Sequence, residues 1–252
     1  MRLENKNAVI TGSAGGLGAA VAEKFAQNGA NVALWDMNEK GLEEMQTKLQ
    51  KYGVIAKGYK ANVTDFDEVQ QIGQQVIQDF GRIDILINCA GGGRDIALGL
   101  RDLDKSQWDK LIDLNLTSAF NCTKAVIENM IENHYGKIVN FSSVAGLRGG
   151  GLLGKAAYAS AKAGIIGLTK AIAKEFAQYG IYANTVAPAL HVTPLIEANM
   201  NPAEIEELKK NFLLKTAGDP GKLAELVVFL ASDDAQFITA ALYTVDGGFS
   251  FH

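Results

Sequence analysis

Short apolar runs alternate along this chain with longer stretches in which apolar residues recur at helical spacing. The runs are typical of strands, which we expect within NAVIT, NVALW, VIAKGYKANV, IDILINCA, KIVNFSS, IYANTVAP and ALYTVDG. Helices are expected in AAVAEKFAQNGA and near 38–52, 65–80, 105–132, 156–179, 203–213 and 220–231. This alternation predicts an α/β fold: a Rossmann-type, doubly wound parallel sheet of about seven strands with helices on both faces.

Nothing in the pattern divides the chain, because no linker, repeat or low-complexity segment interrupts the alternation. We therefore expect residues 1–252 to form a single domain. The net charge is −4 without a long basic run, which argues against a nucleic-acid partner or an anionic membrane. The 2 cysteines provide neither a disulfide framework nor a metal site. No segment resembles a signal peptide or a membrane span, so a cytoplasmic protein is expected.

A glycine-rich turn joins the first expected strand to the first expected helix. In TGSAGGLG the glycines occupy positions 12, 15, 16 and 18. Glycines there allow close approach of the backbone to a pyrophosphate, and the helix N-terminus offers free N–H groups and a positive dipole end. Because strand and helix flank the turn, it predicts a dinucleotide site and not merely a loop.

An acidic residue, Asp36, ends the second expected strand. A carboxylate at this place can accept hydrogen bonds from the ribose hydroxyls of NAD and would repel the 2′-phosphate of NADP. Gly15 and Met37 supply no positive charge for that phosphate. The pattern favours NAD, although a helix-capping or turn aspartate is the alternative interpretation.

Tyr158 and Lys162 lie four residues apart in YASAK, within a proline-free stretch of helical period. Residues at this spacing share a helix face, so the ammonium can lie near the phenol. A nearby cation lowers the pKa of a tyrosine from its usual value of about 10, which would suit an acid/base catalyst. A half-buried tyrosine beside a solvated lysine is the alternative.

Taken together, the motifs resemble the short-chain dehydrogenase/reductase family. TGSAGGLG, NCAG at 88–91, Asn115, Ser143, YASAK and VDGG at 245–248 occur in the order typical of that family. The resemblance extends from Lys6 to Gly248. It implies a single dinucleotide-binding catalytic domain over 1–252 and hydride transfer between a nicotinamide and a secondary carbon.

The resemblance also assigns roles to individual residues. Tyr158 is the expected acid/base, Lys162 lowers its pKa and holds the ribose, Ser143 positions the substrate oxygen, and Asn115 supports a proton relay. Ser142 is the alternative to Ser143, and capping of a turn is the alternative role for both serines. The expected cofactor-binding residues are Gly12, Gly16, Leu17, Gly18, Asp36, Asn62, Val63, Asn88, Ala90, Gly91, Tyr158, Lys162, Pro188 and Thr193.

Three positions depart from the family pattern. Cys89 replaces the second asparagine of the usual NNAG, Asn62 stands where aspartate is usual, and Ala189 stands where glycine is usual. The last change leaves the conformation of the loop after the sixth strand open. Cys89 is expected to be a small packing residue.

The loops around the expected pocket suggest a substrate with an apolar body. The candidate residues are Arg94, Val144, Arg148, Leu153, Leu190 and His191. The leucines would provide apolar surface, and Arg148 and His191 would meet a polar or anionic group. The alternative is that the charged members are solvated loop residues.

These observations predict an NAD-dependent oxidoreductase that acts on a small or medium secondary alcohol or ketone. A 3-oxoacyl-(acyl-carrier-protein or CoA) reductase is the alternative; that branch generally uses NADP and docks its carrier on basic helix ends, where this chain has His134 and Tyr179. A non-catalytic nucleotide-binding regulator is a second alternative. The family resemblance predicts a homotetramer that pairs the long helices, and no metal.

Overall fold

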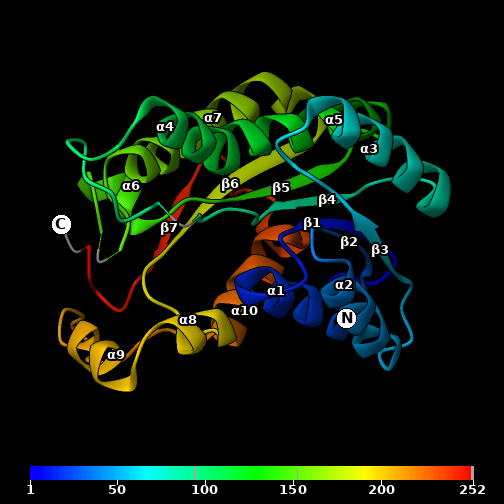
Figure 1. The fold of residues 1–252 in the computed structure, drawn as a ribbon. Coiled ribbons are helices and arrows are strands. Elements are labelled where there is room, and N and C mark those ends of the chain that lie inside the picture. The colour runs from blue at the N-terminus through cyan, green and yellow to red at the C-terminus, as the bar shows by residue number, and fades with distance from the viewer. Residues whose placement is uncertain (94, 152, 251–252) are drawn as a thin grey trace.

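The strands form one fully parallel sheet that is covered by helices on both faces (Figure 1). The structure, a computed structural model, describes residues 1–93, 95–151 and 153–250. The order of the strands across the sheet is β3-β2-β1-β4-β5-β6-β7. Their bounds are β1 Asn7–Thr11, β2 Asn31–Asp36, β3 Ala56–Lys60, β4 Ile85–Asn88, β5 Gly136–Phe141, β6 Ile181–Pro188 and β7 Leu242–Val245. The predicted α/β Rossmann-type fold is confirmed.

Two helical layers enclose the sheet. Figure 1 shows α1, α2 and α10 on one face and α3, α4, α5 and α7 on the other, with α8 and α9 projecting beyond the sheet. The bounds are α1 Gly16–Gln27, α2 Glu39–Gln50, α3 Phe66–Phe80, α4 Lys105–Ile112, α5 Ser118–Glu132, α6 Val144–Arg148, α7 Ala156–Phe176, α8 Pro194–Asn199, α9 Pro202–Lys209 and α10 Pro220–Ala231. Each layer packs on its own core cluster.

The apolar strand residues divide between these two clusters with the period of two that a pleated strand imposes. Ile85 and Ile87 of β4 join the cluster beneath α1 and α10, whereas Leu86 joins the cluster beneath α5 and α7. A strand buried on both faces must be continuously apolar, which is why these runs could be identified as strands from the sequence. The strand order reverses between β1 and β4, and this reversal opens a crevice at the carboxyl ends of the strands.

The predicted helix over 105–132 is interrupted at its middle. α4 and α5 are joined by a π-helical turn over Asp113–Thr117, which contains Asn115. The helix expected near 203–213 ends at Lys209, and two short helices, α6 and α8, occupy segments for which no helix was predicted. No helix among the described residues has the length and apolarity needed to cross a membrane.

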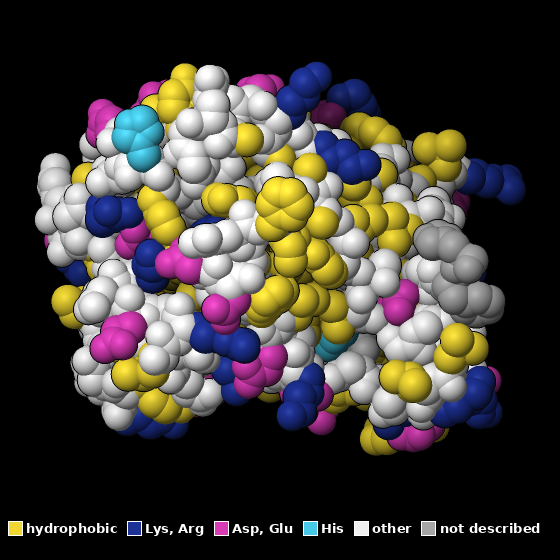
Figure 2. All heavy atoms as spheres, turned by 180° about the vertical axis from the view of Figure 1, so that it is seen from behind, with side chains coloured by type: hydrophobic (Ala, Val, Ile, Leu, Met, Phe, Trp, Pro, Cys, Tyr) yellow, Lys and Arg dark blue, Asp and Glu magenta, His cyan; other side chains and the backbone are white. Residues whose placement is uncertain are grey.

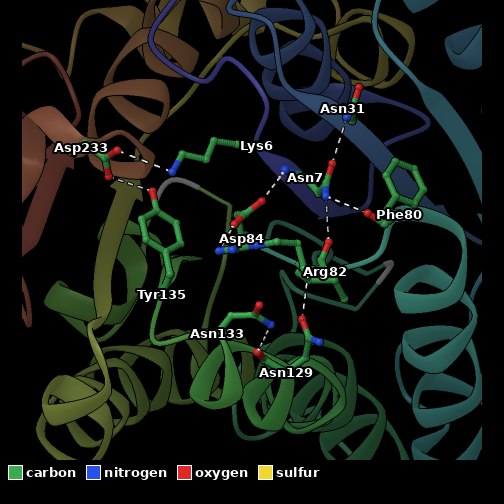
Figure 3. A network of polar contacts seen from close by, with 11 residues as sticks. Lys6, Asn7, Asn31, Phe80, Arg82, Asp84, Asn129, Asn133, Tyr135 and Asp233 are labelled. Atoms are coloured by element: carbon green, nitrogen blue, oxygen red, sulfur yellow. Dashed lines mark hydrogen bonds and ion pairs between the residues drawn. The ribbon is translucent and has the colours of Figure 1, made fainter.

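A polar network links the segments at the amino ends of the strands (Figure 3). Asp84, which is buried, accepts a hydrogen bond from the backbone N–H of Asn7 at 2.9 Å and pairs with Arg82. Asp233 pairs with Lys6 and accepts a hydrogen bond from the Tyr135 hydroxyl. The network joins segments distant in sequence and leaves the carboxyl edge of the sheet free for a ligand.

Candidate active site

The glycine-rich turn after β1 forms a cradle in which side chains have no room. Gly12 and Gly16 have φ of 67° and 56°, in the left-handed region that favours glycine. A Cβ on Gly18 would overlap the carbonyl group of Gly12. Helix α1 begins at Gly16, and no side chain caps its N-terminus. Its first N–H groups are therefore available to a ligand in the crevice. This geometry fits an anionic pyrophosphate at the helix N-terminus.

Asp36 extends the cradle at the end of β2. One of its carboxylate oxygens accepts a hydrogen bond from the N–H of Ala14 and the other from that of Asn38, both at 3.0 Å. The carboxylate is therefore fixed against the glycine-rich turn. Because Asp36 and Asn38 both line the cavity described next, this acceptor faces the space where a ribose would lie.

A cavity of about 520 Å³ runs along the carboxyl ends of the strands. Its walls include the glycine-rich turn, Asp36, Ser143, Tyr158 and Lys162. Except for Asn62, Val63 and Asn88, all the residues predicted to bind the cofactor line it, namely Gly12, Gly16, Leu17, Gly18, Asp36, Ala90, Gly91, Tyr158, Lys162, Pro188 and Thr193. The cavity therefore extends from the turn after β1 to the loop after β6.

The three predicted residues outside the cavity take part in contacts within the fold. Asn88 donates to the side-chain oxygen of Asn140 at 2.8 Å in the buried space beneath α5. Asn62 accepts from the backbone N–H and the hydroxyl of Thr64, just before α3. Val63 is buried, and its carbonyl accepts from the side chain of Asn121.

Ser143, Tyr158 and Lys162 converge at the middle of the cavity. Ser143 precedes α6, where its hydroxyl accepts from the N–H of Ala145 at 3.1 Å, and it lines the cavity together with Tyr158. One turn further along α7, the ammonium of Lys162 donates to the carbonyl of Phe141 at 2.9 Å. It lies 5.8 Å from the centre of the Tyr158 ring. The i, i+4 spacing thus places both side chains at one spot.

The electrostatics at this spot differ from the expectation. Burial raises the pKa of Tyr158, and the Ser143 side chain opposes the rise without cancelling it. The predicted lowering of the tyrosine pKa by Lys162 is therefore not found. Burial also lowers the pKa of Lys162 to about 8. Desolvation penalises the charged form of both groups, and it is the largest cause of each shift. At neutral pH the phenol is a neutral proton donor.

Asn115 supports this group from the π-helical turn. Its side-chain oxygen accepts from the N–H of Gly92 at 2.7 Å, and its amide donates to the carbonyl groups of Gly92 and Leu111 at 2.9 and 3.0 Å. A Cβ on Gly91 would lie 2.9 Å from the Asn115 oxygen and 3.0 Å from the Lys162 ammonium. Asn115 and Lys162 thus flank the same glycine, and that closeness requires residue 91 to lack a side chain.

Comparisons with known proteins agree with this geometry. A family model described as Enoyl-(Acyl carrier protein) reductase matches residues 12–250. The chain is 40% identical over 248 residues to the 3-oxoacyl-[acyl-carrier-protein] reductase FabG of Thermotoga maritima, covering 98% of this chain and 99% of the relative. The chain belongs to the short-chain dehydrogenase/reductase family.

Two further relatives show the breadth of the family around this chain. The (2S)-[(R)-hydroxy(phenyl)methyl]succinyl-CoA dehydrogenase subunit BbsD of Thauera aromatica is 39% identical, with 98% of each chain covered. The crystal structure of gox2181 superposes with a TM-score of 0.93 at 34% identity, over 98% of this chain and 96% of that one. As in other members of the family, a nicotinamide cofactor is expected to occupy the cavity, and the glycine cradle fits its pyrophosphate.

Among the described residues that were predicted to line a substrate pocket, only His191 lines the main cavity. Leu190 is buried and faces a neighbouring cavity of about 190 Å³. Val144, the first residue of the short helix α6, is buried, and Leu153 lines neither cavity. Arg94 lies outside the described residues.

The structure gives Arg148 and His191 contacts other than those expected for anion binding. The Arg148 guanidinium donates to the carbonyl of Phe249 at 2.6 Å and lies 4.5 Å from the centre of the Phe249 ring. It therefore fastens the C-terminal segment. His191 is buried, and burial lowers its pKa, so the imidazole is neutral at pH 7 and carries no charge for an anion.

Several lining residues were missed by the sequence analysis. Ala14 and Asn38 line the cavity beside Asp36, and Ile196 lines it from α8. The first two adjoin motifs that were recognised, so their neighbourhood could have indicated them. Ser142 lines the cavity while its hydroxyl donates to the carbonyl of Lys162 at 2.6 Å, a partner that no sequence pattern reveals.

Proposed function

We propose that this protein reduces 3-oxoacyl thioesters with a nicotinamide cofactor and catalyses the reverse oxidation of 3-hydroxyacyl thioesters. FabG and BbsD, to which it is similar over nearly its whole length, bear names that denote acyl thioesters on acyl carrier protein and CoA. This substrate class falls within the predicted ketones and secondary alcohols. It corresponds to the alternative drawn from the sequence, the 3-oxoacyl reductase.

The observation that carries the proposal is the half-buried Tyr158, neutral at pH 7, which shares the wall of the cavity with Ser143. The two hydroxyls can hold a ketone oxygen between them, and a phenol with a raised pKa keeps its proton available for that oxygen. The bound nicotinamide supplies or accepts the hydride. The chain's own groups orient the carbonyl and deliver the proton as the oxygen becomes an alcohol.

Lys162 and Asn115 complete this arrangement. With a pKa of about 8, the Lys162 amine is still mostly protonated at pH 7 and can pass a proton toward the tyrosine. Asn115 fixes the backbone at Gly92 beside it through two hydrogen bonds. We propose Tyr158, Ser143, Lys162 and Asn115 as the catalytic set, in which Asn115 acts on the position of the others.

For the cofactor we propose NAD(H) over NADP(H). Asp36 presents a fixed carboxylate where the adenosine ribose would lie. Among the described residues that line the cavity, Lys162 is the only lysine or arginine, and it sits beside Tyr158. A 2′-phosphate at Asp36 would therefore meet a like charge without a compensating cation.

The enoyl-reductase branch of the family is not favoured, because it separates its tyrosine and lysine more widely than YASAK does.

The test is reduction of acetoacetyl-CoA followed by the loss of reduced-cofactor absorbance, with NADH and NADPH in parallel. We expect turnover with NADH and a lower kcat/KM with NADPH. Equal or better kcat/KM with NADPH would contradict the cofactor assignment. No turnover of the thioester, together with turnover of simple secondary alcohols, would favour the broader alcohol dehydrogenase that the sequence predicted.

CoA thioesters are the form of substrate we favour. The helix ends that carry basic residues in the carrier-protein branch carry His134 and Tyr179 here. His134, which follows α5, is exposed, and Tyr179 follows α7. A comparison of acetoacetyl-CoA with the acetoacetyl carrier protein at equal concentrations tests this preference.

We also propose a homo-oligomer, as the family resemblance and the sequence predicted. Cytoplasmic location remains an expectation from the sequence. Figure 2 shows a continuous apolar area at the centre of the face seen from behind. Phe66 of α3 and Phe120 of α5 are 42% and 49% exposed, and their rings stack with centroids 6.4 Å apart. Apolar surface of this extent favours burial against further copies of the chain.

A further inference from the structure

His191 occupies an unusual place between two cavities. It lies in the loop after β6 and lines both the main cavity and the neighbouring cavity of about 190 Å³. Only 5% of the residue is exposed. This enclosed side chain belongs to neither the glycine cradle nor the catalytic set.

The hydrogen bonds of the imidazole define its tautomer. Nδ1 lies 3.1 Å from the carbonyl oxygen of Ala189, and a carbonyl can only accept, so Nδ1 must carry the proton. Since burial keeps the ring neutral, Nε2 is then a bare acceptor. In the part of the chain that the structure describes, buried Nε2 has no hydrogen-bond partner. The side chain therefore has one polar contact, and that contact is with its own loop.

The loop that the imidazole braces is tied to two other segments. The N–H of Gly218 donates to the carbonyl of Leu190 at 2.9 Å, and the N–H of Val192 donates to the carbonyl of Gly218 at 3.2 Å. The N–H of Ala189 donates to Val245 at the end of β7, at 3.1 Å. A Cβ on residue 218 would overlap ring atoms Nε2, Cδ2 and Cε1 of His191. The ring thus packs directly on Gly218.

We infer that His191 is a positioning residue that, through its Nδ1–H and the carbonyl of Ala189, shapes the Pro188–Thr193 loop for the nicotinamide end of the cofactor. Pro188, Ala189 and Thr193 line the cavity together with Tyr158, whereas Asp36 and the cradle line the nucleotide part. Loss of the Nδ1–H would leave the Ala189 carbonyl without that donor and release the loop. The inference rests on nicotinamide binding and not on the thioester substrate.

Two substitutions separate the hydrogen bond from the bulk of the side chain. Asparagine places its amide nitrogen where Nδ1 stands, so His191→Asn retains the donor but loses the ring. His191→Leu keeps a similar volume and loses the donor. The probes are NADH and ADP-ribose, which lacks only the nicotinamide ring and so makes no contact of that ring with the Pro188–Thr193 loop. Dissociation constants are measured for both by calorimetry.

We expect His191→Leu to weaken NADH about tenfold, the effect of one lost hydrogen bond, and to leave ADP-ribose within about twofold of wild type. His191→Asn should bind NADH within about threefold of wild type. In steady state the leucine variant should show a raised KM for NADH with a smaller change in kcat.

Three results would overturn the inference. These are unchanged NADH binding by the leucine variant, equal weakening of NADH and ADP-ribose, or failure of asparagine to restore NADH binding. Because binding is measured without substrate, inactivity toward acetoacetyl-CoA would bear on the proposed function alone. Should NADPH prove the tighter ligand, the same comparison is made with NADPH and 2′-phospho-ADP-ribose.

Discussion

The buried ammonium of Lys162 should make the stability of the cofactor-free protein depend on pH in a defined window. Burial lowers its pKa from 10.5 to about 8 in the folded chain, whereas the unfolded chain retains the higher value. Between these two values the unfolded state binds more protons, so the free energy of unfolding rises with pH. The shift corresponds to about 3 kcal/mol at 1.36 kcal/mol per pKa unit.

The perturbation that isolates this effect is Lys162→Met, which keeps the length of the side chain and removes the titration. Urea unfolding of both proteins at fixed concentration is measured from pH 7 to 10.5. Wild type should gain about 3 kcal/mol relative to the variant across this range, with a slope of at most about 1.4 kcal/mol per pH unit. Loss of the bond to Phe141 adds an offset that does not vary with pH.

The control is Lys170→Met, an exposed lysine on the same helix. Its stability curve should run parallel to that of wild type. Burial also lowers the pKa of Lys137, but that residue is present in all three proteins and cancels in the differences. Parallel curves for wild type and Lys162→Met would refute the reasoning, because they would show that the buried ammonium titrates at its ordinary pKa.

Three other outcomes follow from the site and the surface. Tyr158→Phe should abolish reduction of acetoacetyl-CoA while calorimetry shows NADH binding within about twofold of wild type; near-normal turnover would assign the proton to another group. Arg148→Ala should lower the free energy of unfolding by about 1 kcal/mol and shift the KM values of neutral and acidic thioesters together; a rise confined to acidic substrates would restore the anion-binding hypothesis. Light scattering at micromolar concentration should give a tetramer, and a monomer would contradict the oligomer proposal.

The parts of the site that the sequence predicted are those encoded by local spacing. The glycine-rich turn needs φ values that glycine adopts easily, and it lies between a strand and a helix that periodicity identifies. The pair Tyr158 and Lys162 needs only a continuous helix. In both cases neighbours in sequence are neighbours in space, so the pattern carries the geometry.

The remainder depends on partners that no pattern displays. Arg148 bonds to a carbonyl 101 residues away, and Lys162 bonds to the backbone of Phe141. Helix spacing indicated that Tyr158 and Lys162 meet, but it did not show that Lys162 is buried and Tyr158 half-buried. Burial, a property of the whole fold, then reversed the expected direction of the tyrosine pKa.

The loop after β6 shows how a departure from the family pattern is accommodated. Ala189 replaces the usual glycine, yet it is not among the described non-glycine residues with positive φ, so the backbone there needs no glycine. The position that must lack a side chain is instead Gly218, because the His191 ring packs against it.

Gly218→Ala should therefore displace the imidazole and weaken NADH binding to the same extent as His191→Leu. If contact with the ring is the cause, the double variant should bind NADH about as well as either single variant. Additive losses would show that Gly218 acts on the loop through its own backbone, independently of His191.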